Sequence, residues 1–126
     1  MKTIIVVDDD LTNTSLLKML LEIEGYRVVT CKNIEEAKAA ASTSTHTDGF
    51  VVDCHLAGGI SGLSLLRDIR AGKTAVSSNT VVIMASGDHR VQEESLASGA
   101  DRFFLKPYSP TELSTELSTL FNKERT

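Results

Sequence analysis

Five short runs of apolar residues, rich in β-branched side chains, alternate with five stretches whose apolar residues have helical spacing. The apolar runs cover residues 4–7, 26–31, 49–52, 80–85 and 102–105. The helical stretches cover residues 12–24, 33–41, 63–72, 89–98 and 109–121. Because the first run is apolar without alternation, it is typical of a strand buried on both faces of a parallel sheet. The whole pattern predicts an α/β fold of right-handed βαβ units, in which helices cover both faces of a five-stranded, doubly wound parallel sheet.

Local signals define some of these elements further. Asn33 to Glu36 has the spacing of a capping box, and Ser109 to Glu112 offers an N-cap followed by proline and glutamate. The stretch 89–98 has the weakest apolar face of the five, and residues 57–62 predict a flexible loop. Within the first helical stretch, helical spacing is shown by Leu16, Leu17, Leu20, Leu21 and Ile23.

Length and composition limit the class of protein. A chain of 126 residues with 41% hydrophobic and 24% charged residues indicates one globular domain. Its net charge of −4 argues against direct binding to nucleic acid or to an anionic membrane. Neither a signal peptide nor an apolar run of membrane-spanning length is evident, so we expect a cytoplasmic protein. The only two cysteines, Cys31 and Cys54, are expected to be small buried residues. The three histidines are scattered along the sequence and do not suggest a metal site: His46, His55 and His89.

Polar residues directly follow the predicted strands, and those after four of the five are the candidates for a site. Three acids, Asp8 to Asp10, follow the first run, and Asp53 follows the third. Ser86 follows the fourth, and Lys106 follows the fifth. In folds of this kind ligands bind outside the carboxyl ends of the strands, so these side chains are predicted to form one site.

The residue types at these strand ends suit phosphoryl chemistry. Several carboxylates together favour a hard divalent cation such as Mg²⁺. Lys106, the hydroxyl of Ser86 and the amide of Gly87 could bind a tetrahedral anion. Because no histidine base or activated serine is evident, the natural nucleophile is a carboxylate, and the predicted reaction is phosphoryl transfer onto an aspartate. A simpler interpretation of Asp8 to Asp10, that they form an acidic loop that caps the next helix, is open on that stretch alone.

The ordered set of motifs resembles the receiver domain of two-component response regulators. The matching motifs are Asp8-Asp9, Asp53, Ser86-Gly87 and Lys106-Pro107, and the likeness runs from about Lys2 to Phe121. The resemblance implies a flavodoxin-like sheet with strand order 2-1-3-4-5. It also implies that residues 1–126 form a single receiver domain with its core at about 2–122.

The resemblance assigns a role to each site residue. Asp53 would be the phosphoacceptor, receiving a phosphoryl group from a phosphohistidine of a sensor kinase or a phosphotransfer protein. Mg²⁺ would be held by Asp8, Asp9, a carboxylate oxygen of Asp53 and the backbone carbonyl of His55. Lys106 would pair with Asp53 and then with its phosphate.

Two further residues would transmit the change, Ser86 as the switch hydroxyl and Phe103 as the switch aromatic. The family also has a cis peptide before the residue that matches Pro107. The protein would act as a phosphorelay signalling switch rather than as an enzyme with a separate substrate. Its output face, formed by the fourth helix, fifth strand and fifth helix, would contact a downstream protein or output domain. Homodimerisation, and whether the chain is a stand-alone regulator or part of a longer protein, stay open.

The sequence departs from the family pattern near the predicted site. Ala57 stands where the family usually has proline, and Gly62 comes one residue later than the usual glycine, so one residue is inserted after Asp53. Phe103 replaces the commoner tyrosine. Two positions that flank the site and vary within the family are His55, two residues after Asp53, and Asp88, two residues after Ser86. We predict that these two side chains set the lifetime of the phosphorylated state.

Two other functional classes remain as alternatives. Asp8, Asp10 and Thr12 match the D-x-D-x-T motif of haloacid-dehalogenase-like phosphatases, in which Asp8 would be the nucleophile. That interpretation requires a further acidic motif after the lysine, which is missing, and gives Asp53 no role. The third class is a receiver-like interaction module that works without phosphorylation, which the altered loop after Asp53 keeps open.

Overall fold

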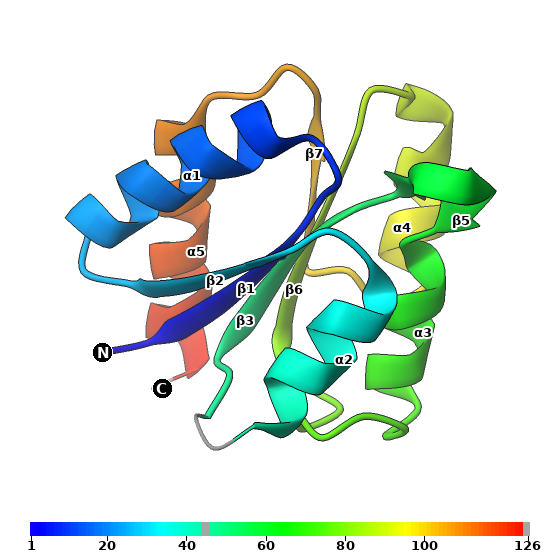
Figure 1. Cartoon of the computed structure of the whole chain (residues 1–126), viewed down its shortest axis with the longest axis horizontal. Coiled ribbons are helices and arrows are strands. Elements are labelled where there is room, and N and C mark those ends of the chain that lie inside the picture. Colours follow the sequence, from blue (N-terminus) through cyan, green and yellow to red (C-terminus); the bar gives the residue numbers. More distant parts are fainter. Residues whose placement is uncertain (44–45, 125–126) are drawn as a thin grey trace.

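The computed structural model describes residues 1–43 and 46–124 and contains one five-stranded parallel sheet (Figure 1). The sheet order is β2-β1-β3-β6-β7, which is the predicted order 2-1-3-4-5 when only these five strands are numbered. The strands are β1 (Thr3–Val7), β2 (Arg27–Cys31), β3 (Gly49–Asp53), β6 (Val81–Ser86) and β7 (Arg102–Leu105). The predicted α/β class and strand order are therefore confirmed.

Helices cover both faces of this sheet, as Figure 1 shows. One face is covered by α1 (Leu11–Ile23) and α5 (Pro110–Glu124). The other is covered by α2 (Ile34–Ser42), α3 (Leu63–Arg70) and the short α4 (Gln92–Ala97). None of the helices in the described ranges has the length and apolar character needed to cross a membrane.

The central strands are apolar throughout because the sheet has a core on each side. In β1, Ile4 and Val6 pack with α1 and α5, whereas Ile5 and Val7 pack with α2 and α3. Successive side chains of a strand point to opposite faces, so a strand with two buried faces needs apolar residues at every position. This arrangement places the carboxyl ends of all five strands at one edge.

The predicted helix starts are present. Asn33 accepts a hydrogen bond from the backbone N–H of Glu36 (2.8 Å), and Ser109 accepts one from the backbone N–H of Glu112 (3.3 Å). Asp10 is the N-cap of α1. Each cap satisfies a backbone donor that the first helical turn would leave without a partner.

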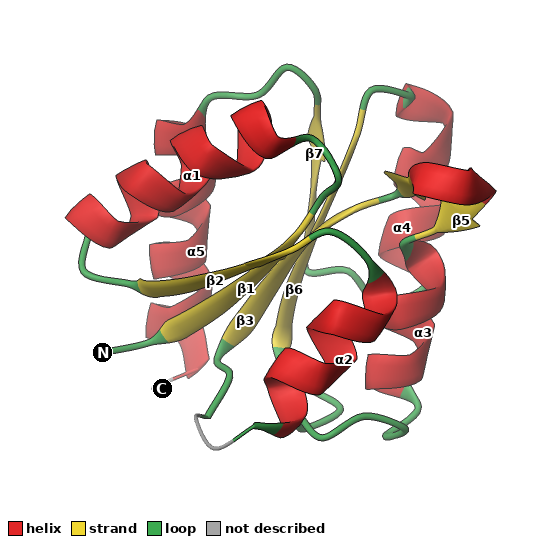
Figure 2. Ribbon diagram, in the orientation of Figure 1, coloured by secondary structure: helices red, strands yellow, loops and turns green. Residues whose placement is uncertain are grey.

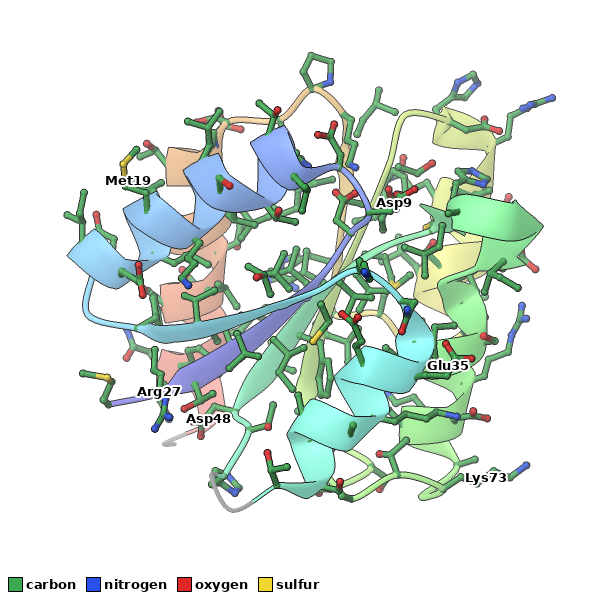
Figure 3. The ribbon with its side chains drawn as sticks, viewed as in Figure 1. Asp9, Met19, Arg27, Glu35, Asp48 and Lys73 are labelled. Carbon is green, nitrogen blue, oxygen red and sulfur yellow. The ribbon has the colours of Figure 1, made fainter. Side chains whose placement is uncertain are left out.

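Only part of the apolar spacing in α1 marks its buried face. Leu17 and Leu21 are fully buried, whereas Leu16 is 53% and Ile23 73% exposed. Met19 also lies on the outer side of this helix (Figure 3). Apolar residues at so many successive positions cover more of the helix circumference than one sheet can bury, so the remaining ones face solvent.

The segment after Asp53 is a short hairpin instead of the predicted flexible loop (Figure 2). Strand β4 (His55–Leu56) pairs antiparallel with β5 (Ile60–Ser61), and the 3₁₀ turn η1 (Ala57–Gly59) joins them. Gly58 and Gly59 have φ angles of 76° and 71°, a conformation that side chains other than glycine rarely adopt. Residues 57–59 therefore have a defined turn conformation.

The sequence predicts one helix over residues 89–98, but the structure does not have a continuous α-helix there. It consists of the 3₁₀ turn η2 (His89–Val91) followed by the six residues of α4. Within α4 only Ser95 is buried, and Leu96 is 44% exposed. The weak apolar pattern of this stretch therefore corresponds to a short and lightly packed helix.

Candidate functional site

The fold brings the polar residues at the strand ends to one edge of the sheet. Asp53 is the last residue of β3 and pairs with Ala85 of β6. Its neighbour Ser86 pairs with Leu105, the residue before Lys106. The strand register alone therefore aligns three of the predicted site residues. Asp8, directly after β1, completes the group through a contact with Lys106.

Three carboxylates at this edge form the candidate metal centre. Asp8, Asp9 and Asp53 each offer an oxygen, and these oxygens all lie within 4.8 Å of one another. Asp8 is buried, Asp53 is half-buried and Asp9 is exposed, so the cluster opens to solvent on one side. Hard oxygen donors that leave room for water suit Mg²⁺, which commonly binds one or two carboxylates and keeps several waters.

Lys106 lies between two of these carboxylates. Its Nζ donates to Oδ2 of Asp8 at 2.8 Å and to Oδ2 of Asp53 at 3.0 Å. Burial disfavours the ammonium charge, but the two carboxylates outweigh that effect and raise the pKa of Lys106. The side chain is therefore a fixed positive charge beside the predicted phosphoacceptor. The peptide between Lys106 and Pro107 is cis, as the resemblance implied.

The two carboxylates that contact Lys106 have different environments. For Asp8, burial opposes ionisation, but hydrogen bonds from Lys106, the Asp10 backbone and Asn13 prevail and lower its pKa. For Asp53, burial prevails over hydrogen bonds from His55 and Lys106 and raises its pKa, with the Asp8 charge adding to the rise. Asp8 is thus the more firmly ionised member of the pair, and the negative charge of Asp53 is the more costly one.

Asn13 is a site residue that the sequence analysis missed. Its Nδ2 donates to Oδ2 of Asp8 at 2.9 Å, and its backbone N–H donates to the capping carboxylate of Asp10 at 3.2 Å. The only available signal was its position in the first turn of α1. That position carries information only once the helix is known to begin at Leu11.

Three further residues were predicted to belong to the site, namely Ser86, Phe103 and His55. Ser86 is fully buried, and its Oγ accepts a hydrogen bond from the N–H of Asp88 at 3.0 Å. Phe103 is half-buried and packs against the core on the α2 and α3 side. The backbone N–H of His55 donates to Oδ1 of Asp53 at 3.1 Å, while its side chain is exposed. That the His55 carbonyl binds the metal stays a prediction.

The carboxylate of Asp88 is held by hydrogen bonds from Arg90, two residues further along the chain. Arg90 donates to it through Nε and Nη2, both at 2.9 Å, and through its backbone N–H. These hydrogen bonds to Arg90 lower the pKa of Asp88 to about 2. Asp88 is therefore ionised near neutral pH and oriented by Arg90.

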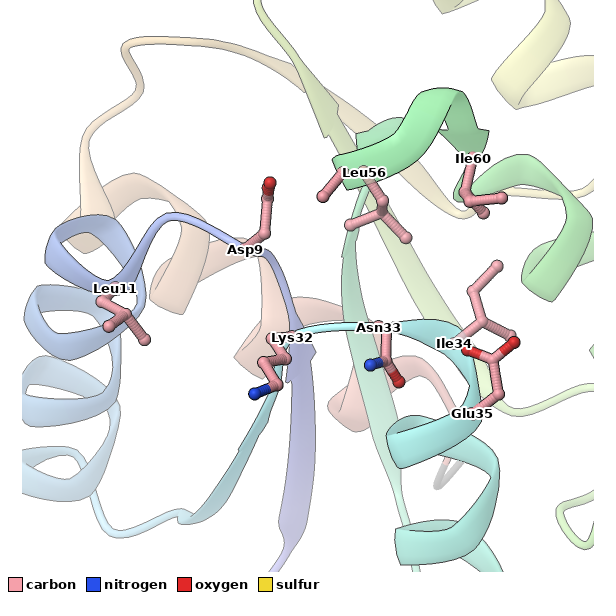
Figure 4. A pocket seen from close by; sticks show the side chains of 9 residues that line it. Asp9, Leu11, Lys32, Asn33, Ile34, Glu35, Leu56 and Ile60 are labelled. Carbon is pink, nitrogen blue, oxygen red and sulfur yellow. The ribbon is translucent and has the colours of Figure 1, made fainter.

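A largely apolar pocket of about 410 Å³ lies next to the acidic cluster and shares only Asp9 with the metal-centre carboxylates (Figure 4). It is bounded by the start of α1, the start of α2 and the β4–β5 hairpin. Its lining residues are Asp9, Leu11, Lys32, Asn33, Ile34, Glu35, Leu56, Ala57 and Ile60. The pocket therefore lies next to the charged centre but is not the predicted phosphorylation site, because neither Asp53 nor Lys106 lines it.

Comparison with known proteins agrees with this geometry. Residues 4–118 match the family model of the response regulator receiver domain. The phosphate regulon transcriptional regulatory protein PhoB of Pseudomonas aeruginosa is 29% identical over 122 residues, which are 97% of this chain and 52% of the relative. The two-component response regulator PhoP of the same organism is 35% identical over 124 residues, 98% of this chain and 52% of the relative. The chain thus spans about half the length of these relatives.

Solved receiver structures have the same fold. The receiver domain of the Francisella response regulator 1452 has a TM-score of 0.85 at 27% identity and covers 98% of this chain and 99% of its own. The response regulator TrrA from Thermotoga maritima, solved in complex with Mg²⁺ and BeF, has a TM-score of 0.81 at 30% identity, with coverages of 95% and 99%. Together with the site geometry, these matches show that the chain belongs to the family of response regulator receiver domains.

Proposed function

We propose that this chain is a phosphorylation-dependent switch in which Asp53 accepts a phosphoryl group from a phosphohistidine. The observation that carries the proposal is the placement of Lys106 between Asp8 and Asp53, with Asp9 close by. A nucleophilic carboxylate, a fixed cation and a carboxylate pair for Mg²⁺ are what phosphoryl transfer onto an aspartate requires.

The residues divide the work of the transfer between them. A carboxylate oxygen of Asp53 attacks phosphorus, the P–N bond of the donor breaks, and its electron pair returns to the imidazole nitrogen. The His55 N–H orients the carboxylate, and Lys106 moves from Asp53 to the phosphoryl oxygens. Bound Mg²⁺ would supply further charge neutralisation beside Asp8 and Asp9. The Ser86 hydroxyl, whose Oγ accepts the Asp88 N–H in this structure, would donate its hydrogen to a phosphoryl oxygen, and the Phe103 ring would follow this movement.

We further propose that residues 2–122 form the working receiver unit of a two-component phosphorelay. Its donor would be a sensor kinase or a phosphotransfer protein, and its output surface would be formed by α4, β7 and α5. A downstream protein or a fused output domain would bind that surface. The domain would catalyse its own phosphorylation and dephosphorylation. A cytoplasmic location stays a prediction.

The phosphatase interpretation is weakened by the contacts of its two key aspartates. Asp8, its nucleophile, is 5% exposed and accepts hydrogen bonds from Lys106, Asn13 and the Asp10 backbone. Asp10 caps α1 through the N–H groups of Thr12 and Asn13. Asp8 is also the more buried of the two candidate nucleophiles, with 6% of its side chain exposed against 11% for Asp53.

The proposal is tested by intact-protein mass after incubation with Mg²⁺ and a small acyl phosphate. We expect one added phosphoryl group in the wild type and none in Asp53→Asn or in the presence of a chelator. An adduct that persists in Asp53→Asn would point to Asp8 and support the phosphatase interpretation. If the wild type gains no phosphoryl group and forms no beryllofluoride complex, it is a non-phosphorylated module.

The lifetime of the phosphorylated state is expected to depend on His55 and Asp88. Asp88→Ala should slow hydrolysis several-fold because the oriented carboxylate can no longer direct a water toward phosphorus. His55→Ala should accelerate hydrolysis several-fold by removing an exposed side chain that shields the phosphoryl group. Loss of phosphoryl protein over time gives the rates, with Glu93→Ala, an exposed acid of the same segment, as the control. Unchanged rates in both variants would contradict this prediction.

The α4 segment is expected to exchange its amide hydrogens faster than α1. It has six residues and one buried side chain, whereas α1 has 13 residues and three. A helix with so few buried contacts opens at a low free energy. Exchange in α4 that is as slow as in α1 would argue against α4 as a movable part of the output surface.

A further inference from the structure

The side chain of Asn13 contacts a carboxylate of the candidate metal centre without carrying a charge. Its Nδ2 donates to Oδ2 of Asp8 at 2.9 Å, the same oxygen that accepts from Lys106 at 2.8 Å. The other oxygen of Asp8, Oδ1, accepts the N–H of Asp10 at 2.9 Å. Because a carboxylate has about four acceptor positions, these described contacts leave one open, and it is on Oδ1.

This arrangement fixes the rotation of the Asp8 carboxylate. Asn13 and Lys106 occupy Oδ2, so the acceptor position that is left on Asp8, which clusters with Asp9 and Asp53, belongs to Oδ1. In the proposed reaction Lys106 turns to the phosphoryl group and no longer holds Asp8. Asn13 is then the side chain that still holds Oδ2 in place.

The backbone makes Asn13 a rigid support. Its N–H donates to the carboxylate of Asp10, and the N–H of Asp10 donates to Asp8, so Asp8, Asp10 and Asn13 form a closed ring of hydrogen bonds. An amide also suits the position electrostatically. A second cation beside Asp8 would compete with a bound metal for its negative charge, whereas a neutral donor orients the carboxylate without doing so.

We propose that Asn13 is a positioning residue that holds Asp8 in the orientation that binds Mg²⁺; this inference rests on the metal centre of the proposed function. Asn13 lines an open groove of about 400 Å³ together with Asp10, Thr12, Leu16, Lys106, Pro107 and Tyr108. Water therefore reaches its surroundings. Loss of a hydrogen bond to a metal-binding carboxylate typically weakens metal affinity by 10- to 100-fold, and we expect the lower end, about 10-fold, at this half-buried position.

The test is a Mg²⁺ titration of the full chain without any phosphodonor, followed by amide chemical shifts in ¹H–¹⁵N NMR spectra. Asn13→Leu removes the amide but keeps a side chain with the same number and branching of heavy atoms, and we expect its Kd for Mg²⁺ to rise about 10-fold. The matched control is Thr12→Ala, because Thr12 lines the same groove but its side chain makes none of the described contacts with Asp8. The same spectra report whether each variant is folded.

A double-variant cycle separates positioning from a general effect on the fold. If Asn13 acts through Asp8, Asn13→Leu should not weaken Mg²⁺ binding further in an Asp8→Asn background. An equal loss in both backgrounds, or an unchanged Kd in the single Asn13→Leu variant, would overturn the inference.

The same titration distinguishes this failure from failure of the proposed function. If the wild type does not bind Mg²⁺, the metal centre of the proposed function is itself contradicted. A second outcome is that the wild type binds Mg²⁺ and is phosphorylated on Asp53, and that Asn13→Leu binds Mg²⁺ with the same Kd. This outcome would overturn only the role of Asn13.

Discussion

Gly62→Ala is expected to lower the free energy of unfolding by about 3 kcal/mol. A Cβ atom on Gly62 would lie 2.0 Å from the backbone oxygen of Asp53 and 2.9 Å from Cγ1 of Val52. Its backbone angles, φ −64° and ψ −17°, are ordinary, so the cost comes from the close approach rather than from the conformation of the residue. The N–H of Gly62 also donates to the carbonyl of Cys54 at 2.9 Å, which prevents an easy shift of the chain.

Urea unfolding without Mg²⁺ measures this loss, because the midpoint and slope give the free energy of unfolding. Gly87→Ala is the matched control: no heavy atom lies within 4 Å of the added Cβ, and Gly87 has no positive φ. We also expect slower phosphoryl uptake in Gly62→Ala, because the backbone that must move belongs to Asp53. If Gly62→Ala is as stable as Gly87→Ala, the prediction is wrong, and the hairpin backbone can shift without a loss in the free energy of unfolding.

The loop before Gly62 is a part of the site that the sequence could not predict. The insertion after Asp53 put the shape of this loop in doubt, and only the structure shows the solution. The residues after Asp53 form the β4–η1–β5 hairpin, and Gly62 lies close to the backbone of Asp53. Hairpin pairing of two residues on each side leaves almost no compositional signal.

The sheet and the central charges were predictable for a physical reason. Strands buried on both faces need continuous apolar runs, and parallel connections bring their carboxyl ends together. The polar residue that stops each run is therefore placed by topology. This is why Asp8, Asp53, Ser86 and Lys106 could be assigned to one site before any distance was known.

Side-chain contacts made across a helix were not predictable in the same way. Which leucines of α1 face the sheet depends on how the helix lies on it, and Leu16 and Ile23 face solvent. The bond from Asn13 to Asp8 depends on the residue at which α1 begins, which a cap at Asp10 determines. Sequence patterns locate helix boundaries only to within a few residues, which is too coarse for such a contact.

The largest combined loss of stability and activity is expected from Lys106→Met. Removing the ammonium leaves the buried carboxylate of Asp8 and the half-buried carboxylate of Asp53 beside each other without their shared partner. Breaking a fully buried pair costs about 3–5 kcal/mol, and the 23% exposure of the Lys106 side chain reduces this to about 2–3 kcal/mol. Phosphoryl uptake should fall by about 100-fold or more, because a fixed cation beside the developing charge is lost.

The pH dependence of this loss has a definite sign. Without Lys106, repulsion between the two carboxylates raises the pKa of the pair in the folded state above its value in the unfolded chain. Folding then favours the protonated form, so the deficit is greatest near neutral pH and shrinks as the pH falls. Urea unfolding of wild type and variant, in chelator and at several pH values, measures the difference between them.

A second substitution identifies the source of the loss. If repulsion between Asp8 and Asp53 is responsible, Lys106→Met should cost much less in an Asp53→Asn background, where the pair carries a single charge. Mg²⁺ should likewise stabilise Lys106→Met more than the wild type, because the cation offsets the charge of the same carboxylate cluster. A loss that is equal in both backgrounds and unaffected by Mg²⁺ would mean that repulsion between Asp8 and Asp53 is not its source.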